Sequence, residues 1–186
     1  MNLRDMMFVS LFTAIIGVMA FFPPILIPGI PVPITAQTLG VMLAGGLLGA
    51  KRGGLSLLIF IALIAVGVPL LSGGRGGLGV LLGPGGGYIF AWPVAAFVIG
   101  YLVEKNINSL NVFKVAFFNI LGGMLVIYAS GVTYLSYASN LPWGPTALTA
   151  LTFIPGDLIK VIIATLIIIK VNQVYPIIGN DKYATR

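Results

Sequence analysis

The segment FIPGDLIKVI, residues 153–162, places an acid and a base in one of the most apolar stretches of the chain. Asp157 and Lys160 lie three residues apart, so on a helix their side chains share one face. Ionisable groups at membrane depth cost about 2.5–3.5 kcal/mol each and usually mark a substrate path. Asp157 accepts hydrogen bonds and Lys160 donates them, which suits a small ligand with N–H donors beside a carbonyl. The alternative is a structural ion pair that only neutralises itself.

Composition indicates what kind of protein surrounds this pair. The chain has 186 residues, of which 59% are hydrophobic and 8% are charged, and its mean hydropathy is +1.10. Soluble domains carry about 25% charged residues, and several apolar runs here approach the ~20 residues that cross a bilayer as a helix. We predict an all-α integral membrane protein with a single domain over residues 1–186. The six expected spans are 6–22, 35–50, 53–71, 85–103, 112–135 and 155–171.

The basic residues predict how these spans are oriented. Eight of the ten fall on one side of the predicted topology: Arg4, Lys51, Arg52, Lys105, Lys114, Lys170, Lys182 and Arg186. The opposite side has only Arg75, and Lys160 lies within a span. The positive-inside rule makes the eight-residue side cytoplasmic, so both termini are expected inside the cell. No basic stripe with interleaved aromatic residues is present, so the net charge of +6 does not indicate nucleic-acid binding.

Two outward loops have unusual compositions. Residues 23–33 contain five prolines, which predicts a stiff extended strap. Residues 73–87 contain nine glycines, which allow close approach of backbone to a ligand or helix. Both loops are also apolar, with Ile25, Leu26, Ile27, Leu78, Val80, Leu81 and Leu82. They are either ordinary connections or, as we favour, lids over an outward-facing cavity.

Missing residue types argue against catalysis. The chain has no His and no Cys, which removes Ser-His and Cys-His nucleophile pairs and the usual zinc ligands. It has no G-x-x-x-x-G-K-[ST] motif, so it is not expected to hydrolyse ATP. Asp157 is the only acid expected within a span, so paired-carboxylate catalysis lacks a second partner. A self-sufficient membrane carrier is the alternative function, although Thr13, Asn119 and Thr165 offer few polar groups for a continuous path.

Three segments resemble the BioY family, the biotin-binding S components of energy-coupling factor (ECF) transporters. They are PVPITAQTLGVMLAGGLLGAKRG (31–53), GGRGGLGVLLGPGGGYIFAWPVAAFVIG (73–100) and PGDLIKV (155–161). The G-P-x-G-G-Y turn, the I-T-A-Q-T-L-G opening and the D-x-x-K pair occur in the family's order. Gly85 departs from the family, which often has Thr at this position. The resemblance implies a prokaryotic multi-pass protein of the cell membrane with six helices.

The resemblance also implies a biotin site. The ureido group of biotin carries two N–H donors beside a carbonyl, which matches Asp157 as acceptor and Lys160 as donor. The bicyclic ring and valeryl chain would pack on Tyr88, Trp92 and the Leu-rich loop, although Trp92 also suits an interfacial belt. Arg75 is the charged candidate for the ligand carboxylate. The other expected ligand residues are Gln37 and Thr35, which ordinary capping or packing would equally explain, and Gly86 of the glycine turn.

Energy for uptake would have to come from partners. The family implies a membrane T subunit and two cytosolic ATPases, with ATP used by those subunits and no cofactor in this chain. The S component is thought to contact the T subunit through its first helix. Here that helix carries Ser10, Ala14 and Gly17 at helical spacing, a small-residue stripe that permits close approach of another helix. Packing against the other five spans is the alternative use of this stripe.

Overall fold

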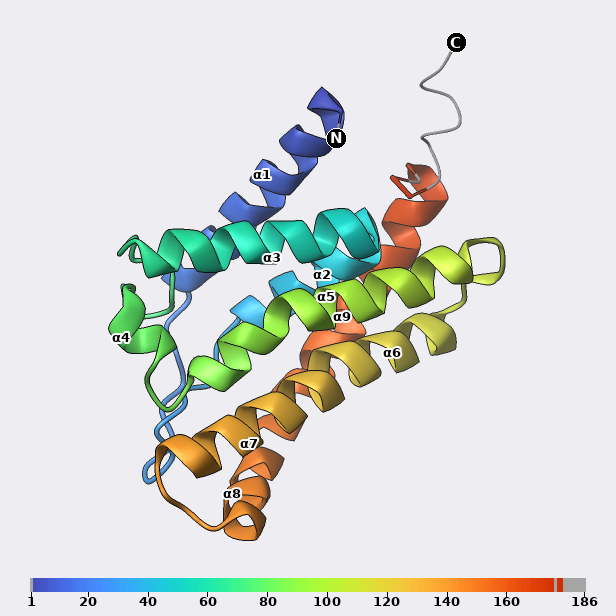
Figure 1. Ribbon diagram of the computed structural model, residues 1–186. Helices are drawn as coiled ribbons and strands as arrows, with labels where there is room; N and C mark the ends of the chain where they lie inside the picture. The colour runs from blue at the N-terminus through green and yellow to red at the C-terminus, as the bar shows by residue number, and fades with distance from the viewer. Residues whose placement is uncertain (1, 176, 179–186) are drawn as a thin grey trace.

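The chain is an assembly of helices with no sheet in the part that is described, residues 2–175 and 177–178 of a computed structural model (Figure 1). The longer helices are α1 (Leu3–Val18), α2 (Gln37–Leu48), α3 (Ala50–Ala65), α5 (Gly86–Lys105), α6 (Val112–Ile120), α7 (Ile127–Ala138), α8 (Trp143–Ala150) and α9 (Ile154–Val174). Short elements are η1 (Met19–Phe21), α4 (Leu78–Leu81), η2 (Ile107–Ser109), the π-helical η3 (Leu121–Val126) and η4 (Leu151–Phe153). Helix α5 packs against α2, α3 and α7 and is the centre of the fold.

Each of the six expected ranges contains a helix, but the lengths differ from prediction. Among the described residues, four segments are long and apolar enough to cross a membrane: Leu3–Phe21, Gly86–Lys105, Val112–Ala138 and Trp143–Val174. Helix α2 has 12 residues, or about 18 Å, and α3 has 16. The prediction of a span ending at residue 71 was wrong, since α3 ends at Ala65. Helix α2 is almost entirely buried by its neighbours, so protein rather than lipid surrounds its short length.

A single residue separates α2 from α3. Gly49 has φ 84° and ψ −178°, a conformation that a side chain would strain. The carboxylate of Glu104, near the end of α5, accepts a hydrogen bond of 2.9 Å from the backbone N–H of Ala50 and thereby satisfies one free donor at the start of α3. Lys51 and Arg52 therefore belong to the first turn of α3, whereas we predicted them in a loop.

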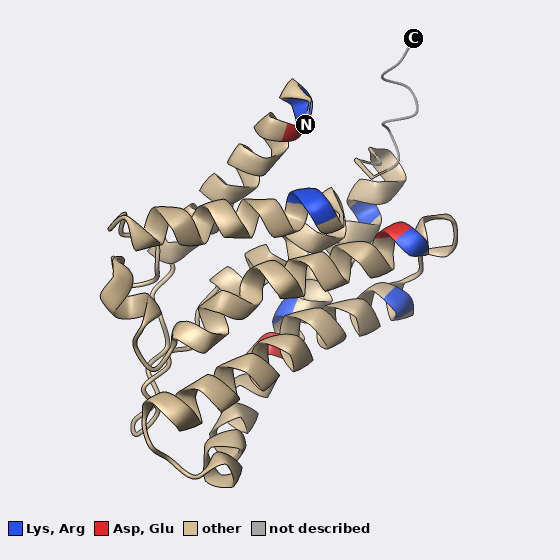
Figure 2. Ribbon diagram, in the orientation of Figure 1, with Lys and Arg blue, Asp and Glu red and all other residues tan. Residues whose placement is uncertain are grey.

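Most of the described basic residues gather at one end of the molecule, and the exceptions are Arg75 in the glycine-rich loop and Lys160 within α9. Figure 2 shows the blue segments of α3, α5 and α6, and the blue segment toward the C-terminal end of α9, at the end that also holds the N-terminus of α1. Asp5 pairs there with Arg52 at 2.7 Å, and Arg4 donates to the Tyr175 hydroxyl at 3.0 Å. The proline-rich and glycine-rich loops lie at the other end of the bundle (Figure 1). Lys182 and Arg186, which the charge argument also used, lie outside the described residues.

The π-helical turn η3 sets the register of the helix that follows it. Residues 112–138 form one continuous helical segment, and η3 lies in its middle. A π-turn closes i→i+5 hydrogen bonds, so it adds a residue and rotates the following side chains by about 100°. Tyr128 is the second residue after this turn, and its hydroxyl contacts Asp157 of α9.

Only part of the small-residue stripe of α1 is exposed. Ser10 and Ala14 are exposed, as is Val18 one turn further along. Gly17 is buried instead, and a Cβ at this position would lie 3.2 Å from the Leu70 side chain. Including Gly17 in an outward docking face was therefore wrong, because Leu70 of the loop after α3 covers it, even though its spacing from Ser10 and Ala14 keeps it on the same side of the helix. The exposed face of α1 runs through Ser10, Ala14 and Val18.

Candidate functional site

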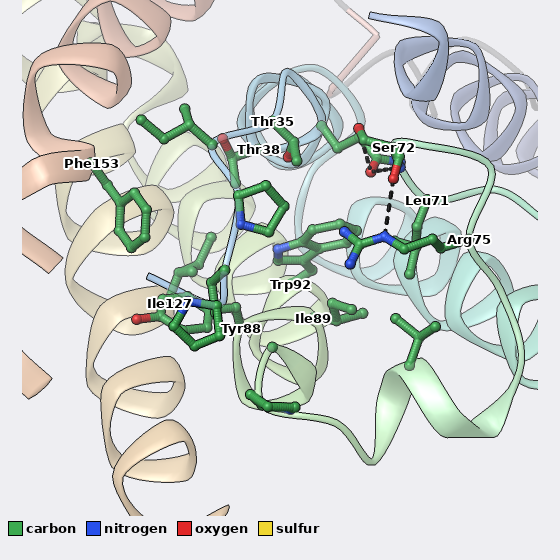
Figure 3. Close-up of a pocket in the computed structure, with 18 of the residues that line it drawn as sticks. Thr35, Thr38, Leu71, Ser72, Arg75, Tyr88, Ile89, Trp92, Ile127 and Phe153 are labelled. Carbon is green, nitrogen blue, oxygen red and sulfur yellow. Dashed lines mark hydrogen bonds between the residues drawn. The ribbon is translucent and has the colours of Figure 1, made fainter. Parts of the chain in front are cut away.

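A cavity of about 290 Å³ lies between the two outward loops and the ends of four helices. Residues 31–35 form one wall, and residues 71–85 form another. The remaining lining comes from α2, α5, α7 and α9, together with Phe153 (Figure 3). Most of the lining is apolar, and a few polar side chains converge on it, which is the usual character of a small-molecule site.

Both loops form walls of the cavity, but not with the apolar residues that we expected. The proline-rich strap turns back on itself, and Ile25 and Ile34 exchange two backbone hydrogen bonds of 2.9 Å. Of the seven apolar loop residues expected to cover the cavity, only Val80 lines it. Leu81 is buried elsewhere, and the side chains of Ile25, Leu26, Leu78 and Leu82 are more than half exposed. Those four lie on the outer surface of the loops.

Asp157 and Lys160 form an ion pair within the cavity wall. The Lys160 Nζ lies 2.7 Å from Asp157 Oδ1, and the two side chains are only 13% and 6% exposed. Nζ also donates to the Thr38 hydroxyl at 2.9 Å, while the Tyr128 hydroxyl donates to Asp157 Oδ2. The pair therefore neutralises itself and also faces the cavity, so the two alternatives from the sequence are compatible. One N–H of Lys160 and further lone pairs of Asp157 are left for a ligand.

Gln37 holds one of the cavity walls in place. Its Nε2 donates to the carbonyls of Ile16 and Leu70 at 3.2 and 2.8 Å, and its Oε1 accepts from the Ser72 backbone N–H at 3.2 Å. Both amide N–H groups are used, and the side chain is buried. Gln37 thus fastens the loop after α3 to α1 and α2, which is the packing alternative for this residue. Gln37 could therefore donate to a ligand only by breaking one of these hydrogen bonds.

Arg75 reaches into the cavity from the glycine-rich loop. Its Nε donates to the Ser72 carbonyl at 3.2 Å, and Leu71 and Arg75 pair through backbone hydrogen bonds of 3.0 and 3.2 Å. In Figure 3 the guanidinium group extends beside Trp92. The bond from Nε fixes the direction of the side chain and leaves the terminal nitrogens facing the cavity. Thr35 lies on the opposite wall and is half-buried.

Tyr88 and Trp92 lie one turn apart on α5, and both line the cavity. Trp92 is 4% exposed and packs on Phe60 with ring centroids 5.9 Å apart, which rules out the interfacial-belt alternative. Tyr88 is 7% exposed, and its ring lies against Gly131 of α7, where any side chain would collide with it. Neither the Tyr88 hydroxyl nor the Trp92 Nε1 has a hydrogen-bond partner among the described residues.

Seven of the eight predicted ligand residues line this cavity, and Gly86 does not. Gly86 instead packs directly on the Leu81 carbonyl, so its role is to let α5 begin close to α4. The sequence prediction missed Thr38 and Tyr128, which complete the polar cluster around the ion pair. Thr38 follows Gln37 within the I-T-A-Q-T-L-G segment, which was a usable signal. For Tyr128 the only sequence signal was a hydroxyl-bearing side chain within an apolar span.

The cavity therefore presents three kinds of groups to a ligand. At one end an ion pair offers both acceptors and a donor, in the middle aromatic rings offer apolar surface, and on the loop side a guanidinium offers a positive charge. Such an arrangement suits an elongated molecule with a polar ring, an apolar middle and an anionic group.

Known proteins resemble this chain over nearly its whole length. The sequence model of the BioY family matches residues 1–177. A biotin transporter BioY of Rhizobium etli is 45% identical over 183 residues, covering 96% of this chain and 98% of that protein. A probable biotin transporter BioY of Bacillus subtilis is 40% identical, covering 93% and 92%. A crystal structure of the S-component for biotin from an ECF-type ABC transporter superposes with a TM-score of 0.88 at 39% identity, covering 91% of each chain.

Proposed function

The chain belongs to the BioY family, and we propose that it is the S component of an ECF-type transporter and captures biotin in the cavity between α2, α5, α7 and α9. It is a multi-pass membrane protein of a prokaryote with a transport role rather than a catalytic one. The observation that carries the proposal is the buried Asp157–Lys160 pair, which lies in the wall of a cavity large enough for a small molecule.

Biotin fits the three kinds of groups in order. The ureido N–H groups would donate to Asp157 and its carbonyl would accept from Lys160, as charge-assisted bonds of about twice the strength of neutral ones. The bicyclic ring and valeryl chain would lie along Tyr88 and Trp92. The carboxylate would meet Arg75, the only basic residue among the described residues of the two cavity loops.

The proposed orientation places the cavity on the outer side of the membrane. The six helical segments would all cross or be enclosed within the bilayer, with both termini in the cytoplasm. Two observations support this orientation: the described basic residues other than Arg75 and Lys160 gather at one end, and the cavity loops lie at the opposite end (Figures 1 and 2). A biotin molecule outside the cell would then reach the site through the loops.

Concentrative uptake would require partners that this chain does not contain. We propose a membrane T subunit and two cytosolic ATPases, which use ATP, while this chain itself needs no cofactor. The exposed face of α1 at Ser10, Ala14 and Val18 is the proposed contact with the T subunit. Small side chains there would allow the two helices to approach closely.

The test of this function is titration of the purified protein with biotin, followed by reconstitution into vesicles. We expect tight one-to-one binding by the protein alone, and biotin accumulation only when the T subunit and the ATPases are present with ATP. Accumulation driven by this chain alone would favour the self-sufficient carrier. Absence of biotin binding by the folded protein would refute the proposal.

Arg75→Ala tests the position of the ligand carboxylate. The substitution removes the guanidinium beside Trp92, so affinity should fall about tenfold for biotin, in line with loss of a hydrogen bond to a charged group. Biotin methyl ester and biotinamide lack the carboxylate charge, so their affinities should fall much less. Titration of both proteins with all three ligands gives the comparison. Equal losses would show that Arg75 does not meet the carboxylate, since effects at a shared contact are not additive.

A further inference from the structure

Two buried hydrogen-bond donors in the cavity wall have no protein partner. Tyr88 and Trp92 are each more than nine-tenths buried, yet the Tyr88 hydroxyl and the Trp92 Nε1 make no hydrogen bond with any described residue. An unsatisfied buried donor is costly, by enough to change a binding constant about tenfold or more. Both residues were expected from the sequence to give only apolar contact. Their polar atoms need another explanation.

The surroundings of Tyr88 place its ring near the ion pair. Phe153 lies 6.1 Å from the Tyr88 ring and 6.3 Å from the Tyr128 ring, so the two tyrosines flank the same phenylalanine. Tyr128 in turn donates to Asp157. Tyr88 thus belongs to the end of the cavity where the polar ring of a ligand would sit, whereas Trp92 lies farther along, beside Arg75 (Figure 3).

In the ion pair, both carboxylate oxygens already accept a hydrogen bond, while the described residues leave one donor free. Each oxygen of Asp157 already accepts one hydrogen bond, from Lys160 and from Tyr128, while Lys160 has one N–H left. Besides the terminal nitrogens of Arg75, the cavity therefore has three donors that the described residues leave unused, one each on Lys160, Tyr88 and Trp92. A ligand that brought only N–H groups would leave them unsatisfied. The wall of α5 selects for acceptor atoms.

We propose that Tyr88 Oη and Trp92 Nε1 donate hydrogen bonds to the ligand, with Tyr88 serving the ureido carbonyl beside Lys160 and Trp92 serving an acceptor in the middle of the molecule. This inference rests on the proposed function and makes α5 a specificity element rather than an apolar wall. The thioether sulfur of biotin is the acceptor in that middle part. A ligand that lacked the carbonyl acceptor would be rejected by Tyr88 and Lys160 together.

The first experiment replaces the hydroxyl of Tyr88 with hydrogen. Tyr88→Phe should lower biotin affinity about tenfold, while thermal unfolding of the ligand-free protein should occur at the same temperature or higher, because the hydroxyl has no internal partner to lose. Tyr137→Phe is the matched control, since Tyr137 is 84% exposed on α7. Unchanged biotin affinity in Tyr88→Phe would overturn the assignment. So would a loss of unfolding free energy in the ligand-free protein as large as the loss of binding free energy. Failure of the parent protein to bind biotin would instead refute the proposed function.

A biotin analogue tests the carbonyl contact itself. In 2-thiobiotin a sulfur, which accepts hydrogen bonds weakly, replaces the ureido oxygen. The parent protein should bind this analogue less tightly than biotin, and Tyr88→Phe should show a smaller difference between the two ligands. Fully additive losses would overturn the assignment of Tyr88 to the carbonyl.

Trp92 can be observed directly, because the chain has only two tryptophans. Trp143 is 57% exposed on α8 and away from the cavity lining, so Trp143→Phe leaves Trp92 as the sole indole without touching the site. The ultraviolet resonance Raman band that reports indole N–H hydrogen bonding should shift when biotin is added to this variant. A band that stays unchanged while biotin binds would overturn the role of Trp92 as a donor.

Discussion

Replacing Lys160 with Met should weaken biotin binding about 150- to 5,000-fold. Removing one partner of a buried ion pair typically costs about 3–5 kcal/mol, because the remaining charge is left without compensation. In this protein the loss falls on binding as well, since Lys160 also holds Thr38 and supplies the N–H that faces the cavity. Asp157→Asn should act in the same direction. Titration calorimetry of the purified variants with biotin provides the measurement.

A double substitution separates loss of binding from loss of folding. Asp157→Asn with Lys160→Met removes both charges, and replacing a buried pair by neutral groups is often harmless to stability. We therefore expect the double variant to unfold near the temperature of the parent and still fail to bind biotin. If a folded single or double variant bound biotin as tightly as the parent, the pair would be structural and the site would lie elsewhere.

The sequence predicted best those contacts that join residues close together in the chain. Asp157 and Lys160 share a helix at a spacing of three, so their contact follows from helix geometry alone. The membrane class and the approximate helix ranges follow from composition and run length, which do not depend on tertiary contacts. Arg75 was found because it is the one basic residue in its loop.

The features that sequence missed depend on contacts between distant segments. Tyr128 reaches Asp157 across 29 positions and through a π-turn whose register no periodicity predicts. The short α4 forms within a glycine-rich run because Leu81 packs into the core, although glycine disfavours helix. Gly17 is buried because Leu70, in the loop after α3, packs against it. Small-residue spacing alone cannot distinguish an inner face from an outer one.

The cavity and the α1 face use different parts of the chain, and this separation makes binding and energy coupling independently testable. None of the residues that line the cavity belongs to α1. The link between them is Gln37, which donates to the Ile16 carbonyl of α1 and to Leu70. Ser10 and Ala14 point away from that link and are exposed, so substitutions there should leave the cavity wall intact.

Ala14→Trp should abolish most biotin uptake by the complete transporter while leaving biotin binding by the isolated protein unchanged. An indole at an exposed position of α1 keeps a partner helix from the close approach that small residues allow. Ala129→Trp is the matched control, because Ala129 is also exposed but lies on α7, across the bundle from α1 (Figure 1). Binding is measured by titration of each purified variant, and uptake by vesicles that contain the T subunit, the ATPases and ATP. Normal uptake by Ala14→Trp would contradict the proposed contact. A parallel loss of binding and thermal stability would show instead that Ala14 packs internally, at the overpacking cost of about 1–3 kcal/mol.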